Sequence, residues 1–229
     1  MIKAIIFDLD HTLFDRYATL SEIAKYIREE LPVNPNLSYT EIVEIMINAD
    51  KAYVHYGWDN ICNHIINETN LFTEKLENSK YFDFVFKYFE KIAIPYPFTI
   101  PTLTQLKNNG FKLGLITNGR PGLQEKKLEL LGLSNMFDRV IVSGQYNCPK
   151  PQLKAFEMMA EWLELKPEEM MYVGDHPLND VDASRKAGYL PVHVNTLGKW
   201  TRPDVEPCKI RIENVSELPK LLTKINGTI

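Results

Sequence analysis

A short apolar run near the start of the chain ends in two closely spaced aspartates, Asp8 and Asp10. Residues 2–9 are rich in isoleucine and contain neither Gly nor Pro, which predicts a strand buried on both faces. Similar runs recur at residues 111–116, 139–142, 170–173 and 190–194, and helices are expected between them at residues 123–131, 153–163 and 182–187. This alternation predicts an α/β fold, a doubly wound parallel sheet with helices on both faces.

The segment between the first run and the later runs contains no convincing strand. Its apolar residues recur at helical spacing, as at Ile23, Ile27 and Leu31. Residues 81–89 alternate like a strand, but apolar side chains also fill the intervening positions, and we interpret this stretch as a helix. At about 150 residues per domain, 229 residues accommodate one domain with an insertion. We therefore expect an α/β core at residues 1–15 and 94–229 and a helical domain at residues 16–93.

The overall charge argues against partners that are bound through a strong positive field. The formal net charge is −4, which disfavours binding to a nucleic acid polymer or an anionic membrane surface. The three cysteines are too few and too scattered for a disulfide framework or a zinc site. No stretch approaches the roughly 18 apolar residues of a membrane helix, and the first residues do not resemble a signal peptide. These features predict a soluble, cytoplasmic protein and leave open whether it is a monomer or a homodimer.

Polar residues follow three of the predicted strands at the point where each strand ends. Asp8 and Asp10 end the first, Thr117 and Asn118 follow the second, and Asp175 follows the run at residues 170–173, with Asp180 five residues further on. Ligands of open parallel sheets bind outside the carboxyl ends of the strands. Each motif alone is common, but their coincidence at strand ends predicts a shared site.

The three carboxylates at these strand ends indicate a chemistry. Asp8, Asp10 and Asp175 offer only oxygen ligands, with neither His nor Cys in the set, which favours a hard cation such as Mg²⁺. A carboxylate beside such an ion can attack a phosphoryl group and form an aspartyl-phosphate. Asp10 is placed to act as general acid toward the leaving oxygen and then as general base toward water.

Taken together, four ordered motifs resemble those of the haloacid dehalogenase-like (HAD) hydrolase superfamily. They are Asp8-Leu9-Asp10-His11-Thr12-Leu13, Ile116-Thr117-Asn118-Gly119, Lys150-Pro151 followed by the helix that contains Phe156, and Gly174-Asp175-His176-Pro177-Leu178-Asn179-Asp180. Their order and spacing extend over the whole chain. The helical insertion after the first motif resembles the α-helical cap of the phosphatase-rich subfamily.

The resemblance implies a role for each matching residue. Asp8 is then the nucleophile and Asp10 the acid/base. Mg²⁺ is held by Asp8, the backbone carbonyl of Asp10 and Asp175, and Asp180 supports the metal or binds it through water. Thr117, the Asn118 amide and Lys150 bind the oxygens of the phosphoryl group that is transferred. From its position alone, Lys150 would be interpreted as a solvated loop residue.

The resemblance also bears on the reaction and its substrate. Dehalogenases of this superfamily lack an acid/base carboxylate at the position of Asp10, so this residue favours phosphoryl transfer. A cap that closes over the site implies a small phosphorylated metabolite, such as a sugar phosphate, a nucleoside monophosphate or a phosphoglycolate-like acid. Arg16, where the chain enters the insertion, is a candidate for binding an anionic substrate, although a surface arginine explains it equally well.

Two alternatives stay open. One is a phosphomutase or a dehalogenase on the same scaffold, and the other is a non-catalytic module that senses phosphate or binds a partner. His11 replaces the glycine that many relatives have in the first motif, and we interpret it as a turn residue. The sequence assigns no role to Arg120, Trp58 or Trp200.

Overall fold

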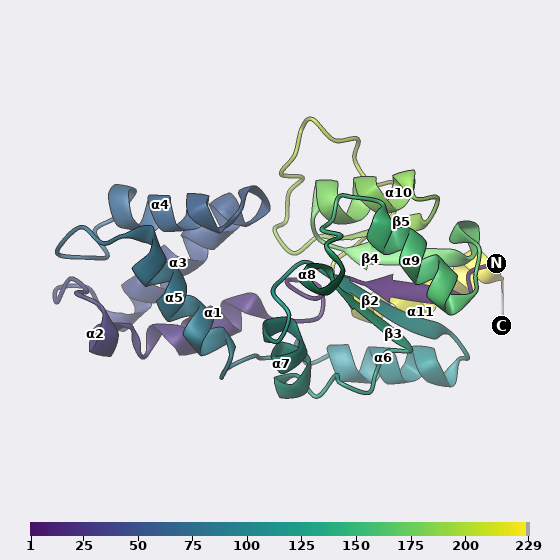
Figure 1. Cartoon of the computed structure of the whole chain (residues 1–229), viewed down its shortest axis with the longest axis horizontal. Coiled ribbons are helices and arrows are strands. Elements are labelled where there is room, and N and C mark those ends of the chain that lie inside the picture. The colour runs from purple at the N-terminus through teal and green to yellow at the C-terminus, as the bar shows by residue number, and fades with distance from the viewer. Residues whose placement is uncertain (228–229) are drawn as a thin grey trace. The chain divides into compact units, whose positions relative to one another are not determined.

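The computed structural model describes residues 1–227, and the chain divides into two compact units. One unit contains residues 1–15 and the chain from residue 95 onward, and the other contains residues 16–94 (Figure 1). We expected the second boundary after residue 93, one residue earlier. The first unit is called the sheet unit below and the second the helical unit.

The sheet unit is built on six parallel strands in the order β3-β2-β1-β4-β5-β6. The strands are β1 (Ala4–Phe7), β2 (Lys112–Thr117), β3 (Arg139–Val142), β4 (Met170–Gly174), β5 (Leu190–Val194) and β6 (Arg211–Ile212). β1 lies in the middle, with Phe7 beside Leu115 of β2 and Val173 of β4. The predicted doubly wound α/β fold is confirmed. Strand order reverses beside β1, so the carboxyl end of β1 is the expected ligand position.

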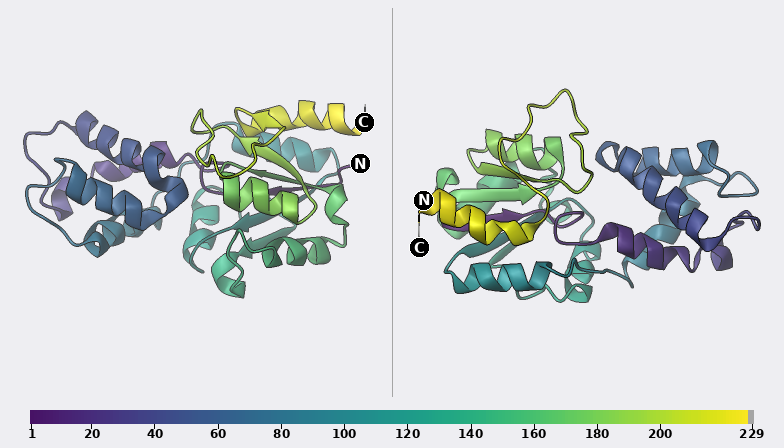
Figure 2. Two further views of the ribbon diagram at one scale, coloured as in Figure 1. Left: turned by 90° about the horizontal axis from the view of Figure 1, so that it is seen from above. Right: turned by 180° about the vertical axis from the view of Figure 1, so that it is seen from behind.

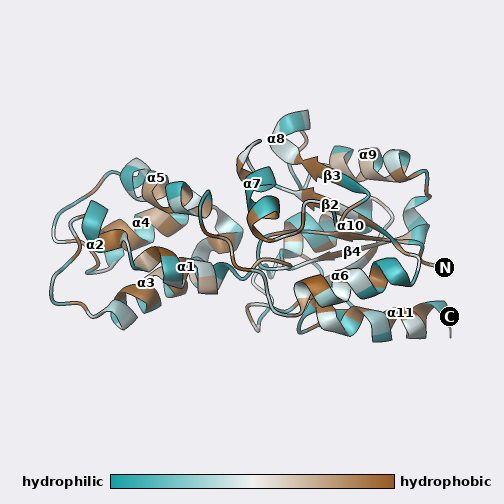
Figure 3. Cartoon of the chain, turned by 90° about the horizontal axis from the view of Figure 1, so that it is seen from below, coloured by the Kyte–Doolittle hydropathy of each residue, from teal (hydrophilic) through white to brown (hydrophobic). Residues whose placement is uncertain are grey.

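Helices cover both faces of this sheet. They are α6 (Thr99–Asn108), α7 (Leu123–Leu130), α8 (Ser143–Tyr146), α9 (Lys154–Leu163), α10 (Ala183–Lys186) and α11 (Leu218–Asn226). α6 and α11 pack together on one face, and α9 and α10 lie on the other (Figures 1 and 2). Figure 3 shows the labelled strands as largely apolar, whereas the helices mix apolar and polar residues. This is the pattern of a sheet buried between two helical layers.

The helical unit consists of α1 (Arg16–Ala24), α2 (Ile27–Glu30), α3 (Tyr39–Tyr53), α4 (Trp58–Glu68) and α5 (Asn78–Phe89). α3 packs against α1 and α4, and α4 packs against α5. α3 begins at a capping box, in which Ser38 and Glu41 satisfy each other's backbone N–H groups. Residues 81–89 lie in α5 and are helical as predicted, because Tyr81, Val85 and Tyr88 fall on one buried face.

Two elements of the sheet unit differ from those that the sequence suggests. The expected helix at residues 182–187 starts earlier, as a π-helical turn from Pro177 to Asp182 that continues into α10. The ring of His176 accepts hydrogen bonds from the backbone N–H groups of Leu178 and Asn179, which caps this early start. β6 was not predicted, because two residues are too few to show a periodic pattern.

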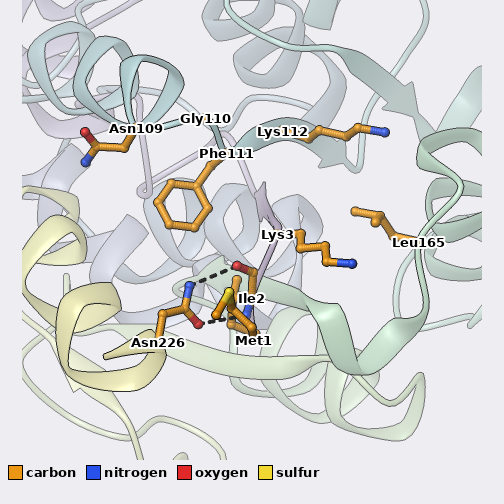
Figure 4. A pocket seen from close by; sticks show the side chains of 9 residues that line it. All are labelled: Met1, Ile2, Lys3, Asn109, Gly110, Phe111, Lys112, Leu165 and Asn226. Carbon is orange, nitrogen blue, oxygen red and sulfur yellow. Dashed lines mark hydrogen bonds between the residues drawn. The ribbon is translucent and has the colours of Figure 1, made fainter. Parts of the chain in front are cut away.

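Within residues 1–227, no helix combines the length and the apolar character needed to cross a membrane. A cavity of about 320 Å³ lies at the amino ends of β1 and β2, and Lys3, Phe111 and Asn226 are among its lining residues (Figure 4). It therefore lies at the opposite edge of the sheet from the predicted site.

Phe156 of α9 provides a test of the sheet unit's packing. It is fully buried between the rings of Tyr172 and Tyr189, with ring centroids 5.1 and 5.8 Å away. Phe156→Ala should lower the free energy of unfolding by about 3 to 5 kcal/mol, through lost burial and the cavity left behind. Urea unfolding measures this loss, and Ile100→Ala, at a position 41% exposed on α6, should cost far less. Equal losses for the two variants would contradict this account.

Candidate active site

The carboxyl ends of β1 and β4 bring three buried aspartates together. Carboxylate oxygens of Asp8, Asp175 and Asp180 all lie within 4.8 Å of one another. Asp8 directly follows β1, its backbone N–H donates to the carbonyl of Val173, and Asp175 directly follows β4. The group does not include the Asp10 carboxylate. β1 ends at Phe7, so strand alternation does not govern where Asp10 points.

Lys150 lies at the centre of this cluster. Its Nζ is 2.7 Å from Asp8 Oδ1, 2.6 Å from Asp180 Oδ1 and 2.8 Å from the hydroxyl oxygen of Tyr172. An ammonium group has three hydrogens, and these three acceptors match them. The residue is 4% exposed, so the interpretation of Lys150 as a solvated loop lysine is wrong.

Burial and charge act in opposite directions on the ionisable groups of the cluster. Burial alone would lower the pKa of Lys150, but the carboxylates of Asp180 and Asp8 more than offset this, and its pKa is raised. Burial raises the pKa of Asp8, and the attraction of Lys150 only partly offsets that effect. The negative charges of Asp180 and Asp175 add to the effect of burial on Asp8, and three carboxylates in one buried group carry more negative charge than one ammonium group balances.

This excess of negative charge bears on whether the site fits a metal ion. Asp8, Asp175 and Asp180 provide only hard oxygen ligands from buried positions, which is the donor set that Mg²⁺ prefers. A divalent cation would also balance the charge that Lys150 leaves over. The residues present therefore fit Mg²⁺.

Asn118 holds the backbone of Lys150. Its Nδ2 donates to the carbonyl of Lys150 at 2.9 Å, and its Oδ1 accepts from the Lys150 backbone N–H at 2.8 Å. The side-chain amide of Asn118 therefore fixes the loop that carries Lys150. The motif after β2 thus positions the lysine that precedes α9.

The loop after β4 is arranged around Asp180. A Cβ atom on Gly174 would lie 2.4 Å from Asp180 Oδ2, so this position requires glycine for the carboxylate to approach. The same oxygen accepts from the backbone N–H of His176 at 2.9 Å. On β5, the ring of His193 lies 3.0 Å from the carbonyl oxygen of Asp175. Asp180 contacts Lys150 directly. This contact is separate from the role in holding a metal ion that the sequence predicts for Asp180.

Tyr172 was missed by the sequence reasoning. Its hydroxyl group accepts from Lys150 and lies 3.1 Å from the carbonyl oxygen of Ile116, to which it can donate. Burial raises the pKa of Tyr172, so the hydroxyl group keeps its proton. The available signal was a single polar side chain in an otherwise apolar buried strand.

Asp10 has its own set of partners. Lys127 Nζ lies 2.8 Å from Asp10 Oδ1, and Gln124 Nε2 lies 3.2 Å from Asp10 Oδ2. The same Gln124 nitrogen donates to Thr117 Oγ1 at 2.6 Å. Both residues were missed, although two polar side chains one helical turn apart, directly after the motif at residues 116–119, were a usable signal.

The remaining candidates lie in different surroundings. In the helical unit, Arg16 forms a buried ion pair with Asp50 at 2.7 Å, and its guanidinium group lies 4.5 Å from the centre of the Trp58 ring. In the sheet unit, His11 has a φ of 62°, the left-handed conformation of a turn, and its carbonyl accepts from Thr196. Trp200 contacts the ring of His193 edge-on at 5.0 Å.

Comparison with known proteins gives concordant matches. The family model described as haloacid dehalogenase-like hydrolase matches residues 5–194. A glyceraldehyde 3-phosphate phosphatase of Methanocaldococcus jannaschii is 33% identical over 98% of this chain and 99% of its own length. The crystal structure of a HAD phosphatase from Thermococcus onnurineus superposes with a TM-score of 0.62 at 27% identity, over 96% of this chain and 98% of that one. An L-2-haloacid dehalogenase from Xanthobacter autotrophicus, at 19% identity and full coverage of both chains, has a TM-score of 0.67 and shows the fold alone.

Replacing Lys150 tests the central cluster. Lys150→Met removes the cation from buried carboxylates, and we expect the free energy of unfolding to fall by about 3 to 5 kcal/mol near pH 8. Because the folded-state pKa of Lys150 is raised above its ordinary 10.5, its contribution is complete below that pH and declines as the pH rises further. The difference between wild type and variant should therefore shrink at strongly alkaline pH.

Urea unfolding of both proteins at several pH values measures this difference. Lys154→Met is a matched control, because Lys154 is exposed and lies four residues away. A difference that grows above pH 10.5 would contradict the raised pKa of Lys150.

Proposed function

The chain belongs to the haloacid dehalogenase-like hydrolase family, and on that basis we propose that it hydrolyses a small phosphomonoester through a covalent intermediate on Asp8. One observation carries this proposal. Two carboxylates two residues apart have separate cationic partners, Lys150 for Asp8 and Lys127 for Asp10. Such a pair can divide the work between a nucleophile and an acid/base.

The proposed reaction has two halves. First, a carboxylate oxygen of Asp8 attacks phosphorus, the bond from phosphorus to the leaving oxygen breaks, and protonated Asp10 donates its proton to that oxygen. The products are an aspartyl-phosphate and an alcohol. Water then attacks phosphorus, Asp10 takes a proton from the water, and the bond between Asp8 and phosphorus breaks. Inorganic phosphate leaves, and both carboxyl groups return to their starting states.

Other residues supply charge and orientation in this proposal. Lys150 places its ammonium group beside Asp8 and would exchange one of its three hydrogen bonds for a phosphoryl oxygen. Thr117 is the last residue of β2, at the same edge of the sheet, and would offer its hydroxyl group to the phosphoryl group. The side chain of Asn118 holds Lys150, and its backbone amide would contact the phosphoryl oxygens, as the sequence led us to expect.

We propose Mg²⁺ as the cofactor. Asp8, Asp175 and Asp180 would hold the ion together with the backbone carbonyl of Asp10. When bound, it supplies positive charge to the phosphoryl oxygens.

Asp10 also favours phosphoryl transfer over dehalogenation and over a non-catalytic binding role. A dehalogenase does not need a proton donor for a halide, and a module that only binds phosphate needs neither a nucleophile nor an acid/base. A phosphomutase uses the same pair of carboxylates, and it differs in returning the phosphoryl group to a sugar. The phosphatase names of relatives that match nearly the whole chain support hydrolysis.

For the substrate we propose a small phosphorylated metabolite, with glyceraldehyde 3-phosphate as the first compound to test. Several relatives that match 90% or more of the chain are named glyceraldehyde 3-phosphate phosphatases. Two relatives that match a smaller part of the chain, 54% and 82%, are named a phosphoserine phosphatase and a phosphoglycolate phosphatase. The helical unit would serve as the cap. Arg16 stays a candidate for substrate binding. It pairs with Asp50 within that unit, so an anionic substrate would have to take the place of Asp50.

A panel of phosphomonoesters tests the proposed activity. We expect the wild-type protein to release inorganic phosphate from at least one of p-nitrophenyl phosphate, glyceraldehyde 3-phosphate, phosphoglycolate, phosphoserine and nucleoside monophosphates in the presence of Mg²⁺. EDTA should abolish the release, and added Mg²⁺ should restore it. Mg²⁺ should also raise the midpoint of thermal unfolding of the wild type but not of Asp175→Asn, since an ion that binds only the folded state stabilises it. A panel without any phosphate release contradicts the proposal, and transfer of phosphate to a sugar favours the mutase.

Substitution of the two aspartates separates their roles. Asp8→Asn removes the nucleophile, so turnover should fall by more than about a thousandfold for every substrate. Asp10→Asn should slow turnover by about a hundredfold or more, because general acid–base catalysis contributes that much. Steady-state kinetics measure both losses, and Asp59→Asn, at an exposed position on α4, is the matched control. Full activity of Asp8→Asn would exclude Asp8 as the nucleophile.

A further inference from the structure

α7 turns two long polar side chains toward the interior of the sheet unit. Gln124 is 1% exposed and Lys127 is 4% exposed, and the two lie three residues apart on the same face of the helix. Lysine is almost never fully buried unless it is paired, because an unpartnered buried charge is costly. The neighbouring Lys126, by contrast, points to solvent and pairs with Glu129 at the surface.

The buried polar groups of α7 meet the Asp10 carboxylate, one at each oxygen. Lys127 binds Oδ1 and Gln124 approaches Oδ2. The Lys127 ammonium group also lies 5.0 Å from the centre of the Phe14 ring, which gives it a second fixed contact. With a donor at each oxygen, the carboxylate cannot rotate without losing a hydrogen bond.

Gly119 makes room for this arrangement. A Cβ atom at this position would lie 2.5 Å from Gln124 Cγ and 2.8 Å from its Cδ. Any larger residue would push the Gln124 side chain away from Asp10 and from Thr117. The glycine after β2 and the glutamine five residues later therefore form one structural unit.

We propose that Lys127 and Gln124 are positioning residues that fix the direction of the Asp10 carboxylate. This proposal rests on the proposed function, in which Asp10 transfers a proton to the leaving oxygen. Proton transfer requires hydrogen-bond geometry at the reacting oxygen, and a misdirected carboxylate loses much of its catalytic effect. Lys127 and Gln124 act through Asp10 and do not touch the substrate.

Leaving groups of different basicity test this role. A p-nitrophenolate departs readily without a proton, whereas an alkoxide needs one from the general acid. In Lys127→Met and in Gln124→Met, kcat/KM should therefore fall about tenfold or more for an alkyl phosphate such as glycerol 3-phosphate and much less for p-nitrophenyl phosphate. This ratio reports the step in which the leaving group departs, and a general loss of structure would lower both values alike.

Two further comparisons link the effect to Asp10. Adding Lys127→Met to Asp10→Asn should cause little additional loss in kcat/KM, because residues that act through one group are not additive. Lys127→Arg should retain most of the wild-type selectivity. Lys126→Met is the matched control on the same helix and should match the wild type for both substrates.

The outcomes separate this proposal from the proposed function. If the wild-type protein releases no phosphate from any substrate, both fail together. If the wild type is active but Lys127→Met and Gln124→Met keep its selectivity between leaving groups, the positioning role is wrong and the proposed function stands. Should Lys127→Met fail to fold, as judged by circular dichroism, Gln124→Met, which keeps the side-chain length, decides the test.

Discussion

The buried ammonium group of Lys150 is the interaction on which the candidate site depends. It joins Asp8 and Asp180, which lie 142 and 30 residues away along the chain. Carboxylates packed this closely would repel one another without a cation, and a cation buried without acceptors would be equally costly. The cluster can form only when β1 and β4 pair, because these strands carry its aspartates to one edge. The pairing of β1 with β4 and the balance of charge at the site therefore depend on each other.

Two carboxylates of the first motif are placed in two different electrostatic environments. Asp8 shares Lys150 with Asp180, whereas Asp10 is bound by Lys127 and Gln124 of α7. The separation follows from the backbone, since β1 ends before Asp8, and Asp10 pairs with Phe14 across the turn at residues 11–13. The net charge of −4 does not reveal this arrangement, because Lys127 and Lys150 are buried beside the carboxylates that they bind. Attraction of an anion to such a site must come from these local charges.

The sequence was sufficient for five of the six strands and for the edge at which polar residues gather. Apolar runs identify strands that are buried on both faces, and parallel strands bring their carboxyl ends to one edge whatever the side chains do. The partners of each side chain depend on tertiary packing, and they were not predictable from spacing. Asn118 turns to the backbone of Lys150, and Arg16 pairs with Asp50 inside the helical unit. Tyr172 is the one polar side chain of a buried strand, but the sequence does not reveal that its hydroxyl group lies beside Lys150.

The glycines of two motifs show what a sequence pattern can conceal. Gly119 and Gly174 resemble turn glycines, but neither is among the residues with a positive φ. Each is required because a polar side chain from the following helical turn occupies the space of its missing Cβ, Gln124 in one loop and Asp180 in the other. In both loops the buried side chain then contacts a member of the site, Asp10 or Lys150. The two glycines are therefore better understood as space left for a polar side chain than as places where the chain turns.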